Sequence, residues 1–497
     1  MWKWKKGSGD QQPNHNETLK DLMNKLSQSK DFMSYELEEP TNCVVSYFET
    51  MIEPKTINRL ILPTLKRNAL HSLEAMKNNI PVEGLAVTDD VNIIRHRFMQ
   101  GHIIIQMKKS DKKVLTIPAV VAENRDVSIP EVEFSVVGPK EAFVESLDTN
   151  INLVRKRLTL PQLIVKEVNI GKLTKTRVAI LYVEGVANEE NVNTVEQRLE
   201  DIEYDQINDS SYITQIIADN SNSPFPQLLD TERPDRVTGS LVEGKIAILV
   251  DGSPHGLTCP TTIVEFFSAS DDYFLPWHLA SAFRLIRLFA VIFSVLSTPL
   301  YIAILTYHHE MIPQDLLATI VSSRADIPFP PILEVIILEL TIELLREAGA
   351  RLPMKVGQTI GIVGGIVIGT AAVEAGLTSN VLLIIVALAA LASFTTPVYQ
   401  IGNTIRLVRF PFMIGAQLWG LVGVSLVMAF FIAHLLKLRS IGRPFFAPIY
   451  PLRFRDLKDA FIRLPFNKQS QRPIQTRPID SERFNQKRAS EKRDIDE

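Results

Sequence analysis

The stretch from residue 357 to 374 constrains the fold of this chain more than any other. Glycines recur in it at a stride of four, at Gly357, Gly361, Gly365 and Gly369. In a helix of about 3.6 residues per turn these positions lie along one side, which then carries no side chains. Each glycine would cost a helix in water roughly 1 kcal/mol relative to alanine, whereas in a bilayer a bare stripe lets another backbone approach closely. The stretch therefore predicts a membrane helix with a close-packing face.

Two roles fit this glycine stripe, which Gly364 extends by one further bare position. The stripe can serve helix packing alone. Alternatively, the stripe or the isoleucine and valine face beside it surrounds a narrow conduction path in an oligomer. Glu374, which closes the stretch, is then a candidate acid of the cation pathway. One chain does not decide between the two roles.

Apolar runs divide the chain into a soluble portion and a membrane portion. Mean hydropathy over the 497 residues is only +0.08 because it averages two unlike halves. Up to about residue 287 no apolar run reaches the roughly 18 residues that a span requires, whereas the segment 288–436 contains several. We expect an α/β soluble portion of two subdomains, followed by an all-α, multi-span membrane domain. The expected division is a flexible tail (1–40), two cytosolic subdomains (41–160 and 161–275), the membrane domain (276–442) and a basic tail (443–497).

The net charge, the cysteine count and the lack of catalytic motifs argue against several classes of function. The formal net charge is −3, so no bulk field favours nucleic acid. The basic N-terminus lacks the apolar core of a secretory signal. Cys43 and Cys259 are far apart, so we expect two buried free thiols on the reducing side of the membrane. The sequence contains no convincing phosphate loop, metal-ligand spacing or nucleophile elbow, and we predict no enzyme activity, no cofactor and no metal.

Strands and helices interleave in the soluble portion. Alternating or buried apolar runs predict strands at 101–107, 114–121, 131–137, 163–170, 177–183 and 245–250. A charged tip at 108–113 joins the first two runs as a hairpin. Helical spacing is found at 191–202 and 211–218, and Pro234 is suited to the first turn of a further helix.

Three further runs are long and apolar enough to span a bilayer: 288–307, which contains Pro299, then 380–398 and 410–436. Trp419 lies inside the last run, which we expect to be one continuous helix. Arg406 and Arg409 precede that run and basic residues also follow it, so the charge rule favours both orientations. The larger basic excess after residue 436 favours a cytoplasmic C-terminus.

The helix expected at 332–349 combines isoleucine and leucine with an acidic stripe at Glu339, Glu343 and Glu347. Each charge facing hydrocarbon would cost at least about 2.5 kcal/mol, so the stripe must face water, protein or a counter-charge. Arg346 and Arg351 lie within reach of Glu343 and Glu347 at spacings of three and four. One interpretation is an interfacial amphipathic helix with paired charges. The other is that symmetry copies of these acids form rings that concentrate cations near a pore.

Several motifs together resemble the GerA family of spore germination proteins, specifically the large A subunit of nutrient germinant receptors. They are Gly-Pro-Lys-Glu-Ala-Phe-Val-Glu (138–145), Asp-Thr-Asn (148–150), Ser-Pro-Phe-Pro-Gln (223–227), Thr-Glu-Arg-Pro-Asp (231–235), Asp-Gly-Ser-Pro (251–254), Ile-Pro-Phe-Pro-Pro (327–331), Glu-Leu-Leu-Arg-Glu-Ala-Gly (343–349) and the glycine stretch (357–374). Each motif alone is weak, but the combination is specific and covers roughly residues 138–465.

The resemblance implies a multi-pass protein of the spore inner membrane with its N-terminal domain in the cytosol. It implies a transporter-like B subunit that binds the nutrient, a lipoprotein C subunit, and a homo-oligomer, expected to be a pentamer, that forms a nutrient-gated cation channel. The SpoVAF type, which shares most of these motifs, implies instead an amplifier of germination. A secondary transporter and a non-conducting scaffold are the other candidate functions, and the absence of a repeat between the halves of the membrane region weighs against a transporter.

Overall fold

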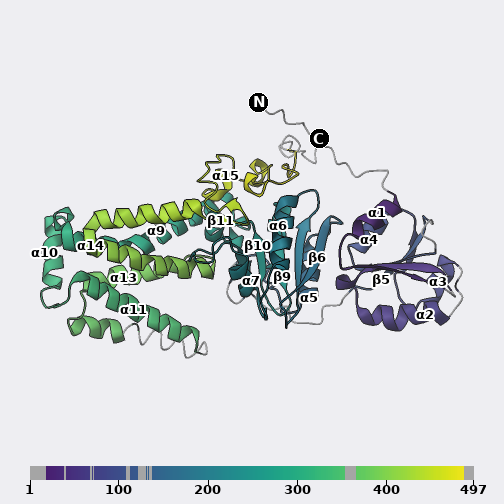
Figure 1. Ribbon diagram of the computed structural model, residues 1–497, viewed down its shortest axis with the longest axis horizontal. Helices are drawn as coiled ribbons and strands as arrows, with labels where there is room; N and C mark the ends of the chain where they lie inside the picture. Colours follow the sequence, from purple (N-terminus) through teal and green to yellow (C-terminus); the bar gives the residue numbers. More distant parts are fainter. Residues whose placement is uncertain are drawn as a thin grey trace, which may run out of the picture.

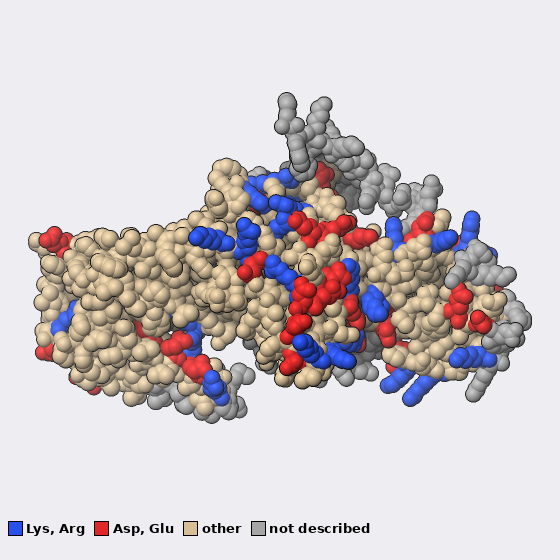
Figure 2. Space-filling view, in the orientation of Figure 1, with Lys and Arg blue, Asp and Glu red and all other residues tan. Residues whose placement is uncertain are grey.

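Three units follow one another along the long axis of the computed structural model (Figure 1). The structure describes residues 18–38, 41–67, 70, 72–107, 112–120, 130, 133, 137–352, 365 and 367–485. Two units are sheets with covering helices, and the third is a helical unit spanning residues 277–437. On the face seen in Figure 2, charged side chains gather on the two sheet units, whereas the helical unit is mostly uncharged.

The first sheet has the strand order β1-β2-β4-β5-β3, and all its described pairs are antiparallel. The strands are β1 (Phe32–Leu37), β2 (Cys43–Phe48), β3 (Ala86–Thr88), β4 (His102–Gln106) and β5 (Val114–Pro118). Helices cover both faces: α1 (Leu19–Leu26) and α4 (Val91–Phe98) on one, α2 (Leu62–Arg67) and α3 (Leu73–Asn79) on the other. Ile104 faces the first helix pair, and its neighbours Ile103 and Ile105 face the second, because side chains alternate along a strand.

The second sheet repeats this plan with the order β6-β7-β9-β10-β8, again antiparallel. Its strands are β6 (Leu163–Ile170), β7 (Thr176–Val183), β8 (Leu229–Thr231), β9 (Ile246–Val250) and β10 (Gly256–Cys259). One core lies between the sheet and α6 (Glu189–Glu200) and α7 (Ser210–Ile216). The other lies under α5 (Leu147–Arg157) and α8 (Pro234–Val242). All five residues of β9 are buried, as its unbroken apolar run requires.

The predicted mixture of strands and helices is confirmed, with one refinement. The runs at 101–107, 114–121, 163–170, 177–183 and 245–250 are strands, and 191–202 and 211–218 correspond to α6 and α7. Pro234 occupies the first turn of α8. The run 131–137 lies mostly outside the described residues. Because all the described strand pairs of both sheets are antiparallel, the layers are α+β and are not made of parallel strand-helix-strand units.

Packing divides the soluble portion differently from the expected boundaries. Helix α1 lies in the core of the first sheet, although residues 1–40 were expected to form a tail. Helix α5 lies in the core of the second sheet, although the sequence division assigned it to the first subdomain. The two units meet at Arg155 of α5, whose guanidinium is within 2.6 Å of Asp31 and 4.3 Å from the centre of the Phe48 ring.

The helical unit contains α9 (Trp277–Tyr307), α10 (Gln314–Ser323), α11 (Pro331–Ala350), α13 (Asn380–Ser393) and α14 (Tyr399–Lys437). By length and composition, α9 and α14 could each cross a membrane, whereas α13 has 14 residues. Helix α9 begins well before the apolar run at 288–307, so Arg284 and Arg287 are part of the helix. Pro299 lies inside it.

The expectation of one continuous helix at 410–436 is wrong, because α14 folds back on itself. Trp419 and Gly420 have non-helical backbone angles, and Gly420 has φ +57°. Phe412 and Phe431 would lie about 28 Å apart in a straight helix, yet their rings stack with centroids 5.5 Å apart. The helix is therefore a hairpin with arms of 399–418 and 421–437. Glycine at the bend accepts the positive φ that other residues resist.

Both ends of this helical hairpin lie next to the second sheet. Thr404 Oγ1 donates to the carbonyl of Pro224 at 2.6 Å, and His434 Nε2 lies 2.9 Å from Ser223 Oγ. The bend lies at the far end of α9, where the Tyr307 hydroxyl donates to the carbonyl of Gln417 at 2.9 Å. The hairpin thus leaves the second sheet and returns to it.

The chain after α14 lies on the second sheet unit. It contains β11 (Arg439–Ser440), β12 (Arg443–Pro444) and α15 (Leu457–Ala460), and it is the yellow segment above the middle of Figure 1. Ser440 Oγ donates to the carbonyl of Gln227 at 2.6 Å. The 3₁₀ and π turns of the molecule are Glu49–Met51, Thr56–Ile61, Ile263–Phe267, Ser270–Tyr273, His309–Met311, Phe466–Lys468 and Ile474–Thr476.

Candidate functional site

The acidic helix α11 holds its first two carboxylates inside the protein. Glu334 is fully buried, and its Oε1 lies 2.7 Å from Arg324 Nη2. Glu339 is also buried, and Arg409 Nη1 lies 2.5 Å from both of its carboxylate oxygens. Such proximity of opposite charges is the arrangement in which a buried charge is tolerated.

Arg409 connects four helices of the helical unit. It lies on the first arm of α14 and bonds Glu339 on α11. Its Nη2 donates to Ser294 Oγ on α9 at 2.7 Å and to the carbonyl of Ala389 on α13 at 3.5 Å. From the sequence, Arg409 was expected only as a charge that flanks the last apolar run. Its position inside the apolar run around 407–412 is the signal that could have identified it, because a charge there needs a buried partner.

The outer acids of α11 are paired along their own helix, as the spacing predicted. Arg346 contacts Glu343 three residues before it, and Arg351 Nη2 lies 2.6 Å from Glu347. Arg406 of α14 lies 4.0 Å from Glu343 as a second cation. Glu343 and Glu347 keep about half of their side-chain surface exposed, at 41% and 59%, whereas Glu339 keeps 8%. The acidic stripe is therefore split into a buried end and an exposed end.

Three residues of the predicted glycine stripe, Gly357, Gly361 and Gly364, lie outside the described residues. A Cβ at Gly365 would meet no atom of the described residues within 4 Å. A Cβ at Gly369 would lie 3.8 Å from Leu383 of α13, an ordinary packing distance. Glu374 is exposed on the helical turns that follow. The described part of the stripe thus has one open position and one position against α13.

An arginine network joins the start of α9 to the soluble units. Arg284 and Arg287 both bond the buried Asp272 carboxylate, and Arg284 Nη1 also lies 3.1 Å from Asp459. Arg463 of the C-terminal segment donates to the carbonyls of Asp272 and Leu275. The helical unit is therefore joined to the second sheet unit by a buried polar cluster, made by residues distant in sequence.

Two features of the second sheet bear on its chemistry. His255 Nδ1 lies 3.1 Å from Asp230, and this carboxylate raises the pKa of His255 above its usual 6.5. Asp230 Oδ2 also accepts from Gln400 Nε2 of α14 at 3.1 Å, which ties the histidine to the helical unit. Burial raises the pKa of the Cys259 thiol to about 12, and Cys43 is likewise free and buried. The prediction of two buried free thiols is confirmed.

Comparison with known proteins assigns the family. The model of the "Bacillus/Clostridium GerA spore germination protein" family matches residues 20–475. This chain belongs to the GerA family. Spore germination protein GerQA of Bacillus cereus is 50% identical over 469 residues, which is 94% of each chain. Spore germination protein GerIA of the same species is 47% identical, over 93% of this chain and 69% of that protein.

Other GerA relatives extend the comparison. Spore germination protein A1 of Bacillus subtilis is 37% identical over 85% of this chain and 88% of its own. A solved structure, the N-terminal domain of the A subunit of the Bacillus megaterium spore germinant receptor GerK3, is 28% identical with a TM-score of 0.37. It covers 48% of this chain and 91% of that domain. The expected resemblance to the GerA family is confirmed.

Proposed function

We propose that this chain is the A subunit of a nutrient germinant receptor, and that copies of it form a nutrient-gated cation channel in the spore inner membrane. The observation that carries the germination role is the 50% identity to GerQA over 94% of both chains. A transporter-like B subunit binds the nutrient, and a lipoprotein C subunit completes the receptor. The oligomer is proposed to be a pentamer with the sheet units in the cytosol.

The helical hairpin supports a multi-pass arrangement. Each arm of α14 has 17 to 20 residues, which is about 25–30 Å of helix and close to the hydrocarbon thickness of a bilayer. Helix α9 starts beside the second sheet and α14 ends beside it. The C-terminal segment then lies on the same side of the membrane as the sheets, in agreement with the cytoplasmic C-terminus that the basic excess favours.

The glycine stripe supports the conduction path. Among the residues that the structure describes, a Cβ at Gly365 would meet no atom within 4 Å. Such a face is available to other copies of the chain or to a passage between them. Glu343 and Glu347, the exposed acids of α11, are proposed to raise the local cation concentration near this passage. Nutrient binding would shift an equilibrium between closed and open packings of these helices.

A non-conducting scaffold, or a SpoVAF-type amplifier, is the second candidate. Each of the four acids on α11, namely Glu334, Glu339, Glu343 and Glu347, has an arginine within 4.0 Å. Paired carboxylates blunt an acidic ring, and this observation favours a structural use of the helix.

Ion flux from liposomes distinguishes these candidates. The full chain and its partner subunits are reconstituted into liposomes loaded with K⁺, and nutrient is then added. We expect Gly365→Leu to change K⁺ efflux several-fold without preventing assembly, because a Cβ at this position meets no atom of the described residues within 4 Å. Gly369→Ala, which only adds an ordinary contact to Leu383, is the matched control. Equal efflux from wild type and a correctly assembled Gly365→Leu variant would favour the scaffold.

A further inference from the structure

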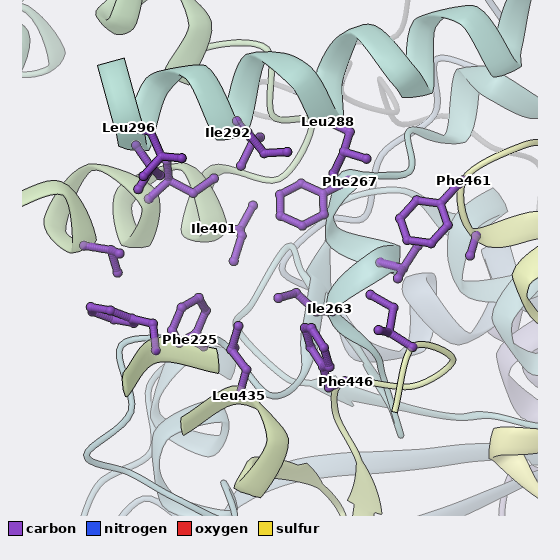
Figure 3. Close-up of a pocket in the computed structure, with 18 of the residues that line it drawn as sticks. Phe225, Ile263, Phe267, Leu288, Ile292, Leu296, Ile401, Leu435, Phe446 and Phe461 are labelled. Atoms are coloured by element: carbon purple, nitrogen blue, oxygen red, sulfur yellow. The ribbon is translucent and has the colours of Figure 1, made fainter. Parts of the chain in front are cut away.

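An apolar cavity of about 320 Å³ lies between α9, both arms of α14 and the second sheet unit. In Figure 3, Leu288, Ile292 and Leu296 reach into it from α9, opposite Ile401 and Leu435 of α14. Phe267, Phe446 and Phe461 close its end near the soluble units (Figure 3). Its volume is at the lower end of the range of ligand sites in proteins. Water gains little in such a cavity because the walls offer few hydrogen-bond partners.

The cavity opens toward the outer surface of the helical unit. Leu285 and Ile292 of α9 both line it, yet their exposed fractions are 49% and 50%. A molecule in the surrounding hydrocarbon could therefore reach the cavity between α9 and α14 without unfolding either helix. A peptide segment is a poor occupant, because its backbone N–H and C=O groups would find no partners among these side chains. A hydrocarbon chain needs none.

One charged side chain lies in the cavity wall, at the end near the soluble units. Arg284 is 5% exposed, and its buried Nη2 has no hydrogen-bond partner among the residues that the structure describes, although its Nε and Nη1 are both bonded. The network around it contains three guanidiniums, of Arg284, Arg287 and Arg463, and two carboxylates, of Asp272 and Asp459. This leaves one positive charge. An anionic group at this end of the cavity, beside the Arg284 side chain, would balance the charge.

We propose that this cavity binds one acyl chain of a membrane phospholipid, with the lipid phosphate at Arg284. The lipid enters from the leaflet on the side of the sheet units. It would wedge between α9 and the α14 hairpin, where these helices join the second sheet, so its presence would affect how they move together. The proposal rests on the membrane placement in the proposed function but not on ion conduction.

Photo-crosslinking tests the site. The full chain is reconstituted in vesicles of phosphatidylethanolamine and phosphatidylglycerol that contain a tracer of phosphatidylglycerol with a diazirine-bearing acyl chain. We expect crosslinks at the buried cavity residues Ile405 and Val408, in addition to outward residues such as Phe430, which is 72% exposed. Crosslinks at outward residues alone would overturn the lipid site. Their absence from the whole helical unit would instead contradict the membrane placement.

Two substitutions and a second probe sharpen the test. Val291→Phe fills the cavity and should abolish crosslinks at Ile405, whereas Val422→Phe, the same change at a 62% exposed site outside the cavity, should leave them unchanged. A diacylglycerol probe with the same acyl chain lacks the phosphate. The diacylglycerol probe cannot make the charged interaction between phosphate and Arg284. It should therefore label the cavity about tenfold less than the phospholipid probe. Equal labelling by both probes, or unchanged labelling of Val291→Phe, would overturn the proposal.

Discussion

Two buried ion pairs join distant parts of this molecule, and their surroundings differ. Arg155–Asp31 lies between two sheet units that each have a complete hydrophobic core. Arg409–Glu339 lies inside the helical unit, where it connects α14 to α11 and, through Ser294, to α9. The Arg155–Asp31 pair holds two separately folded sheet units next to each other, whereas the Arg409–Glu339 pair lies in the interior of the helical unit. Equal chemistry therefore predicts unequal consequences when each pair is broken.

Breaking the pair in the helical unit should have the largest effect. Arg409→Leu leaves the Glu339 carboxylate buried without its cation, which costs about 3–5 kcal/mol. Hydrogen exchange on the reconstituted protein should show lost protection across α9, α11 and α14. The double variant Arg409→Leu with Glu339→Leu should recover most of it, because an apolar pair of similar size is often neutral. If the double variant exchanged its amide hydrogens as fast as the single variant, the buried charge of Glu339 would not be the cause of the lost stability.

Breaking the soluble pair should loosen a joint and leave both units folded. Arg155→Leu leaves the buried Asp31 carboxylate without its cation, but Ser29 and Thr50 still donate hydrogen bonds to it. We therefore expect the free energy of unfolding to fall by about 1–3 kcal/mol. Exchange should rise at the joint, including the Lys30 amide that donates to the Val165 carbonyl, while amides of β4 and β9 stay protected. Unfolding of either sheet in this variant would remove the distinction between the two pairs.

Alanine at two helical glycines should act in opposite directions in the two halves. A Cβ at Gly423 would overlap the carbonyl of Gly415 on the opposite arm of α14, so Gly423→Ala should cost about 1–3 kcal/mol and separate the arms. A Cβ at Gly239 of α8 would meet no atom within 4 Å in the part of the chain that the structure describes, so Gly239→Ala should stabilise the second sheet unit by about 0.5–1 kcal/mol. Thermal unfolding should show a lower melting temperature for Gly423→Ala and a higher one for Gly239→Ala. A neutral Gly423→Ala would argue against close contact of the arms.

The joint between the two halves should respond weakly to pH. The pKa of His255 is raised above 6.5 by Asp230, so protonated His255 stabilises the folded state. This contribution is complete below about pH 6.5 and is lost as the pH rises through the folded-state pKa. The free energy of unfolding of the second sheet unit should therefore fall as the pH rises above about 6.5. His255→Gln should flatten that slope, and an unchanged slope would assign it to another group.

Local patterns determined much of this protein. Strands such as Leu163–Ile170 could be predicted because alternation and turn residues are properties of neighbours in sequence. The pairs of Glu343 with Arg346 and Glu347 with Arg351 followed from helix geometry for the same reason. The division into soluble and helical portions and the GerA resemblance were also readable from the chain.

Only the tertiary structure decided which distant groups meet. The partner of Glu339 is Arg409, 70 residues away, and no periodicity encodes that distance. Trp419 and Gly420 bend an apolar run that length and composition alone describe as one helix. The lipid-sized cavity likewise needs α9, both arms of α14 and the C-terminal segment to be assembled. These features depend on contacts between residues that are far apart in sequence. Such contacts form only when the chain has folded, so local sequence patterns do not predict them.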